Sequence, residues 1–135
     1  MSHHSFSART PLAILAAAVV FVAPTAMHGA IARRHAYLVR SEPAAHDTTS
    51  APRAVRLWFS ERVELKVTRI KLAHAAGGAV PMNKPAPAGD DADAPIVATV
   101  AETLAPGAYT VKWSTAGKDG HPSKGTIDFV VKSAR

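Results

Sequence analysis

The chain has 135 residues and no cysteine, which excludes both a disulfide scaffold and a thiolate metal site. Its formal net charge is +6, from 16 Lys and Arg against 10 Asp and Glu. The basic residues are scattered and alternate with apolar ones, which indicates solvent-facing sides of strands and argues against a nucleic-acid surface.

The first 32 residues are typical of an export signal. A short, mildly basic head is followed by an apolar run over residues 11–23, which is too short to span a bilayer. Ala30-Ile31-Ala32 fits an A-x-A cleavage rule, so residues 1–32 are predicted to be a signal peptide, cut after residue 32 or 34. The alternative is an uncleaved anchor. No other stretch is apolar enough to cross a membrane, so we expect a soluble, exported mature chain over residues 35–135.

The mature chain has the pattern of a β protein. Short runs with alternating apolar residues end at turn signals about every ten residues, and no helical period is sustained. This pattern predicts an all-β fold, an antiparallel sandwich or Greek-key barrel. Within the run 65–72 the two faces are mixed, which predicts a bulge or register change near Arg69. Residues 83–95 are expected to form a long surface loop. The predicted strands are 36–40, 54–59, 65–72, 79–81, 96–100, 108–115 and 124–132.

One ordered loop stands out between the last two predicted strands: Gly117-Lys118-Asp119-Gly120-His121-Pro122. An Asp and a His two residues apart can place a carboxylate oxygen beside an imidazole nitrogen, and such a pair can hold Cu(II) or Zn(II). Two ligands do not make a tight site, so we expect further ligands from the start of the mature chain near His35. The alternative is that Asp119 and His121 only cap the loop.

Four segments match a known family when they are taken together, in their order and spacing. They are His35-Ala36-Tyr37-Leu38-Val39, Leu57-Trp58-Phe59-Ser60-Glu61, the run Leu104 to Trp113, and Asp119-Gly120-His121-Pro122. Over about residues 35–132 the chain thereby resembles the CopC family of periplasmic copper-binding proteins. The resemblance implies a seven-stranded Greek-key β-barrel or sandwich, Ig-like and cupredoxin-like in appearance, that binds Cu(II) at one end.

In that family the Cu(II) ligands are the amine and imidazole of an N-terminal His and the Asp and His of the D-x-H loop. His35, Asp119 and His121 occupy these positions, and some members add the Glu that Glu61 matches. Nitrogen and oxygen donors in a tetragonal plane are what Cu(II) favours. Glu61 could equally be a solvated acid at a strand end or an outer neighbour of the site. His46 and His74 match nothing and are expected to be surface residues.

Two departures from the family pattern matter. Arg33-Arg34 precedes His35, so a cut after Ala32 would place His35 third in the mature chain. An amine, two backbone amides and a third-position His form a square-planar Cu(II) chelate, which would displace Asp119 and His121. The second departure is that only Met82 follows the leader, whereas a Cu(I) site needs several thioethers. The sequence therefore predicts Cu(II) binding only.

The function that the resemblance implies is a periplasmic copper carrier or buffer in copper homeostasis or resistance. We expect a monomer that is not an enzyme, binds no nucleic acid, and hands copper to an inner-membrane transporter of the CopD type. Two alternatives stay open: a metal-free Ig-like adhesion module, and a copper oxygenase built on an N-terminal His.

Overall fold

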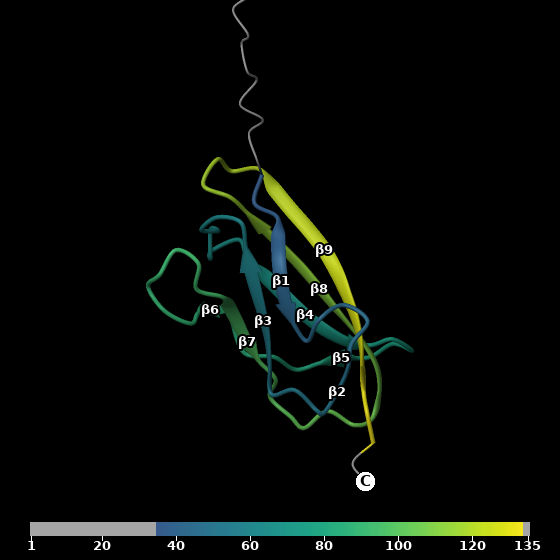
Figure 1. Cartoon of the computed structure of the whole chain (residues 1–135). Coiled ribbons are helices and arrows are strands. Elements are labelled where there is room, and N and C mark those ends of the chain that lie inside the picture. Colours follow the sequence, from purple (N-terminus) through teal and green to yellow (C-terminus); the bar gives the residue numbers. More distant parts are fainter. Residues whose placement is uncertain (1–34, 134–135) are drawn as a thin grey trace, which may run out of the picture. The chain divides into compact units, whose positions relative to one another are not determined.

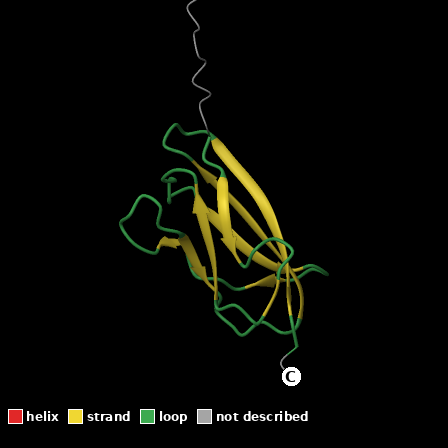
Figure 2. Cartoon of the chain, viewed as in Figure 1, coloured by secondary structure: helices red, strands yellow, loops and turns green. Residues whose placement is uncertain are grey.

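The computed structural model describes residues 35–133; the predicted signal peptide and its cleavage site lie outside them. This part of the chain contains strands and loops but no helix (Figure 2), and so offers no helix that could cross a membrane. The strands are β1 (Leu38–Glu42), β2 (Thr48–Thr49), β3 (Ala54–Phe59), β4 (Arg69–His74), β5 (Ala79–Val80), β6 (Ala86–Pro87), β7 (Ile96–Thr99), β8 (Gly107–Ala116) and β9 (Pro122–Val131).

These strands form two sheets that pack face to face (Figure 1). The first sheet has the order β1-β3-β7-β6, and the second has the order β2-β9-β8-β4-β5. All pairs are antiparallel except β2 with β9. The predicted all-β sandwich is confirmed, as two open sheets without closure into a barrel. All seven predicted strands have counterparts, and the two-residue strands β2 and β6 are additional.

The core between the sheets follows from the period of two along each strand. Val55 and Leu57 of β3 meet Leu72 of β4 and Val111 of β8, and each of the four is at most 1% exposed. Burial of one such side chain stabilises the fold by about 1.5–3 kcal/mol. Trp113 is also buried, as expected for a core aromatic, and meets Phe59 edge to face at 5.3 Å between ring centroids.

Strand β4 begins later than the sequence predicts. Residues 65–67 form a turn, with the Thr68 backbone N–H donating to Leu65 O at 3.2 Å. The buried Thr68 hydroxyl hydrogen-bonds the Thr115 hydroxyl of β8 at 2.7 Å and Glu64 O at 2.8 Å. These bonds hold the turn, so the irregularity expected near Arg69 is the start of the strand.

The β8–β9 connection and the start of the described chain lie at the same end of the sandwich (Figure 1). A bridge between Val63 and Gly117 ties this connection to the segment after β3. Gly120 has a φ of 77°, a conformation that glycine adopts without steric cost.

Candidate metal centre

His35 is held in place by the residues that follow it. Ala36 is only 1% exposed and belongs to the core, so the backbone next to His35 is fixed against the sandwich. Tyr37 N–H donates to the Ser60 hydroxyl at 3.1 Å, and Ser60 N–H donates back to Tyr37 O at 2.9 Å. His35 is thereby anchored to the first sheet, beside the end of β3.

Asp119 and His121 are set by the loop between β8 and β9. The backbone N–H of His121 donates to Asp119 Oδ1 at 3.1 Å, which closes an Asx turn. The other carboxylate oxygen, Oδ2, lies 2.9 Å from Nδ1 of the His121 ring. The loop therefore presents a carboxylate and an imidazole side by side, as the Asp-x-His spacing predicts.

These three side chains converge although His35 and Asp119 are 84 positions apart in the sequence. His35 Nδ1 lies 3.5 Å from Asp119 Oδ2, and the His35 and His121 rings are 4.5 Å apart between centroids. One ligand atom from each of the three falls within 4.8 Å of the other two. Donors bound at about 2.0–2.1 Å to one ion stand roughly 3–4 Å from one another, so only a small inward movement is needed.

The neighbours of the Asp119 carboxylate favour its charged form. The backbone hydrogen bond from His121 is the largest cause lowering its pKa below the ordinary 3.8, and partial desolvation opposes it. The His121 side chain lowers the pKa further, by its hydrogen bond and its charge, and a hydrogen bond from His35 adds to this. Asp119 is therefore an ionised oxygen donor at neutral pH.

We call His35, Asp119 and His121 the triad. Glu61 lies at its edge but is not one of the three side chains that meet. Gly117 separates Glu61 from Asp119: a Cβ on Gly117 would collide with the Glu61 carboxylate and lie 3.1 Å from Asp119 Oδ1. The missing side chain at Gly117 lets both carboxylates approach this end of the sandwich. The sequence pointed to Glu61 but not to the steric role of Gly117, which only the packing reveals.

The other histidines after His35 lie away from the triad, as expected for surface residues. The His74 ring contacts the Tyr109 ring at 4.6 Å between centroids, with the ring planes tilted by 37°, near the opposite end of β8. His46 has a φ of 63°, and its N–H donates to Asp128 O. Neither shares a metal-binding cluster with the triad within residues 35–133.

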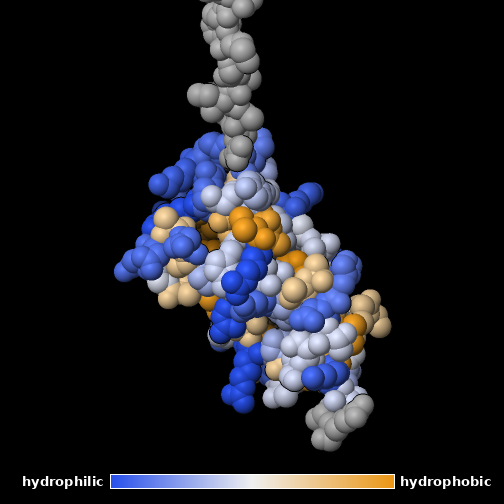
Figure 3. Space-filling view, viewed as in Figure 1, coloured by the Kyte–Doolittle hydropathy of each residue, from blue (hydrophilic) through white to orange (hydrophobic). Residues whose placement is uncertain are grey.

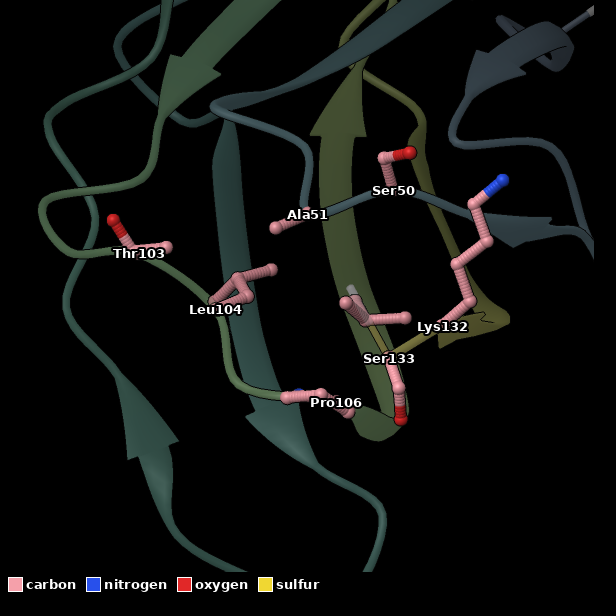
Figure 4. Close-up of a pocket in the computed structure, with 8 residues that line it drawn as sticks. Ser50, Ala51, Thr103, Leu104, Pro106, Lys132 and Ser133 are labelled. Carbon is pink, nitrogen blue, oxygen red and sulfur yellow. The ribbon is translucent and has the colours of Figure 1, made fainter. Parts of the chain in front are cut away.

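The triad lies on an exposed rim, not in a cavity. The side chains of His35, Asp119 and His121 are 54%, 30% and 48% exposed. A cavity of about 870 Å³ lies instead near the C-terminal end of β9 and has no histidine or carboxylate in its lining (Figure 4). It is lined by Ser50, Ala51, Thr103, Leu104, Pro106, Val131, Lys132 and Ser133.

Comparison with known proteins gives consistent matches. A family model described as the CopC domain matches residues 38–132. Copper resistance protein C of Xanthomonas campestris pv. juglandis is 34% identical over 122 residues, which cover 87% of this chain and 95% of that protein. Protein YobA of Escherichia coli (strain K12) is 35% identical over 99 residues, covering 73% and 79%. The crystal structure of PcoC, a copper resistance protein from Escherichia coli, superposes with a TM-score of 0.65 at 31% identity, covering 71% of this chain and 99% of that one.

Proposed function

Because this chain belongs to the CopC domain family of copper resistance proteins, we propose that it binds Cu(II) and carries or buffers the ion in the periplasm. The observation that carries the proposal is the meeting of His35, Asp119 and His121 at one end of the sandwich. Two imidazoles and an ionised carboxylate are nitrogen and oxygen donors of the kind that Cu(II) selects.

The fourth donor is the amine of His35, which becomes available when the chain is cut before this residue. Amine and imidazoles supply three nitrogens, and Asp119 supplies one oxygen, which completes a tetragonal plane. Glu61 has its carboxylate beside Asp119 across Gly117, so it serves as an outer acidic neighbour of the ion. Its negative charge adds attraction for a divalent cation without occupying the plane.

The exposure of the triad suits a protein that exchanges its ion. Both imidazoles are about half exposed, so a competing ligand can reach the copper without opening the core. A carboxylate occupies one donor position, which leaves less room for a reacting oxygen species than an oxygenase needs. We therefore favour a carrier over an enzyme, acting as a monomer that delivers copper to an inner-membrane transporter of the CopD type.

The proposal is tested on the protein purified from the periplasm, with its intact mass measured first. A chain that begins at His35 should bind one Cu(II) with an electron paramagnetic resonance spectrum showing three nitrogen ligands. A metal-free adhesion module would bind no copper near neutral pH. A chain beginning at Arg33 would show a four-nitrogen chelate and would replace the ligand set proposed here. Strong peroxide production with ascorbate would instead favour the oxygenase.

A further inference from the structure

Four cationic side chains gather on the outer face of the second sheet, next to the loop that carries Asp119 and His121. The register places Ser114 of β8 between Arg69 of β4 and Lys124 of β9, and it places Lys112 of β8 between Lys71 and Thr126. All four cations are exposed. They surround a shallow hollow of about 540 Å³. We call Arg69, Lys71, Lys112 and Lys124 the basic face.

The charge of the basic face is not compensated within the sandwich. No ion pair within residues 35–133 involves any of its members. The Arg69 guanidinium donates only to backbone carbonyls, of Lys66 and Thr68, each at 2.9 Å. Farther along the same face of β9, the Asp128 carboxylate accepts a hydrogen bond from the Thr110 hydroxyl at 2.6 Å. That carboxylate marks the far limit of the basic face.

Two of the lysines are placed where they repel each other. Lys71 and Lys112 are direct cross-strand partners on the antiparallel β4–β8 pair. Like charges directly opposite in this way destabilise a sheet. The fold therefore concentrates positive charge at a position where packing alone favours an opposite or neutral pair, and a negatively charged partner would relieve the repulsion.

We propose that the basic face docks an acidic segment of the protein that exchanges copper with this chain, an inference that rests on the proposed copper function. Lys124 follows His121 by three residues, about 10 Å along an extended strand. The β8–β9 loop and Lys124 therefore lie at the same end of β9 (Figure 1). A partner seated on the basic face would thus have the triad at the edge of the contact. Charge of this kind speeds encounter and orients it without tight binding, as a transfer of cargo requires.

An acidic protein segment fits this surface better than an anionic bilayer. The four cations border a concave hollow, into which a protruding carboxylate chain can reach, whereas a flat lipid surface would meet only the rim. Interfacial membrane binding also uses apolar side chains that insert between lipids. Of the exposed large hydrophobic residues among residues 35–133, none lines the hollow. Figure 3 shows an apolar area elsewhere, over β1, where Val39 is 60% exposed.

The test uses hexaglutamate as the acidic probe and hexaglutamine as its neutral counterpart. Copper-free, ¹⁵N-labelled mature protein is titrated with each peptide, and amide chemical shifts are followed. We expect hexaglutamate to shift amides of β4, β8 and β9 around the basic face, and hexaglutamine to shift none. The double variant Lys71→Gln/Lys112→Gln should weaken hexaglutamate binding by about fivefold or more. Lys84→Gln/Lys132→Gln removes the same charge outside the basic face and should change it less than about twofold.

Three results would overturn the inference. The first is an equal loss in both double variants, which would show that only net charge matters. The second is shifts that map elsewhere or do not occur. The third is binding of the basic face to vesicles of 30% phosphatidylglycerol in phosphatidylcholine with no response to hexaglutamate, which would make it a lipid surface. Copper affinity should be the same in wild type and Lys71→Gln/Lys112→Gln. If the wild type takes up no copper, the proposed function fails while the peptide result stands by itself.

Discussion

Replacing His121 by alanine is the sharpest test of the copper site. The change removes one of three converging donors and leaves His35 Nδ1 and Asp119 Oδ2, which are 3.5 Å apart. It keeps the backbone N–H of residue 121, which donates to Asp119 Oδ1 and is the largest cause of the lowered Asp119 pKa. The carboxylate should stay ionised and in place, so the loss measured is that of the imidazole.

The expected loss of Cu(II) affinity is at least about 100-fold, or roughly 2.7 kcal/mol at 1.36 kcal/mol for each factor of ten. Removing a hydrogen-bond partner of a metal ligand already costs about 10–100-fold, and a ligand itself should cost no less. The His121 side chain is 48% exposed, so the free energy of unfolding should change by less than about 0.5 kcal/mol. A large loss of affinity would therefore not reflect misfolding.

The assay is competition for Cu(II) against a coloured chelator, with thermal unfolding of the copper-free proteins alongside. His74→Ala is the matched control, because it removes an exposed histidine far from the triad. A His121→Ala variant with an affinity within about threefold of the control would refute the proposed copper site. That result together with an intact mass starting at Arg33 would identify the third-position His chelate, which needs neither Asp119 nor His121.

Three further outcomes follow from the same structure. Gly125→Ala would place a Cβ 2.7 Å from Cζ2 and 2.9 Å from Cε2 of the buried Trp113 ring; such overpacking costs about 1–3 kcal/mol, and an unchanged melting temperature would contradict it. Copper affinity should fall in acid, because protons compete with Cu(II) for the amine and imidazole nitrogens. The pKa of Asp119 is lowered, so the contribution of this carboxylate to folding stability is present above about pH 3.8 and is lost as the pH falls through the folded-state pKa. A copper affinity that stays constant until the pH reaches this acidic range would oppose nitrogen ligands. Anaerobic titration should find no tight Cu(I) site, since Met82 packs against the core; nanomolar Cu(I) binding would count against this.

The fold was predictable wherever the pattern is local. Strand β3 runs over Ala54–Phe59, as predicted, because the alternation of Val55, Leu57 and Phe59 continues to its end. The late start of β4 was not predictable, since it depends on the hydrogen bond between the Thr68 and Thr115 hydroxyls, 47 residues apart. A period of two says nothing about contacts across the sandwich.

The candidate metal centre was also predictable only where its geometry is local. The Asp119–His121 pair was predictable from its spacing, because the turn that joins the two residues is local. The approach of His35 was expected from the family resemblance, and its physical cause is the pairing of Tyr37 with Ser60, which no local pattern reveals. The ligand assignments themselves stay predictions until the metal titrations are done.

The basic face shows how scattered residues can form one surface. In the sequence Lys71, Lys112 and Lys124 are far apart, and each was interpreted correctly as facing solvent. The register of β4, β8 and β9 sets them next to one another. Charge clustering in a sheet is therefore a property of strand pairing, which a count along the chain does not capture.

The proposed ligands come from both layers of the molecule: His35 precedes β1 of the first sheet, and Asp119 and His121 belong to a loop of the second. An ion bound there would link the two sheets at this end, in addition to the apolar core and the bridge between Val63 and Gly117. Without the ion, local unfolding would begin at this end of the sandwich, where β1 pairs only with β3. If copper is the cargo, as proposed, its binding would stabilise the sandwich at this end, and the copper-free protein would be cleaved more readily by proteases.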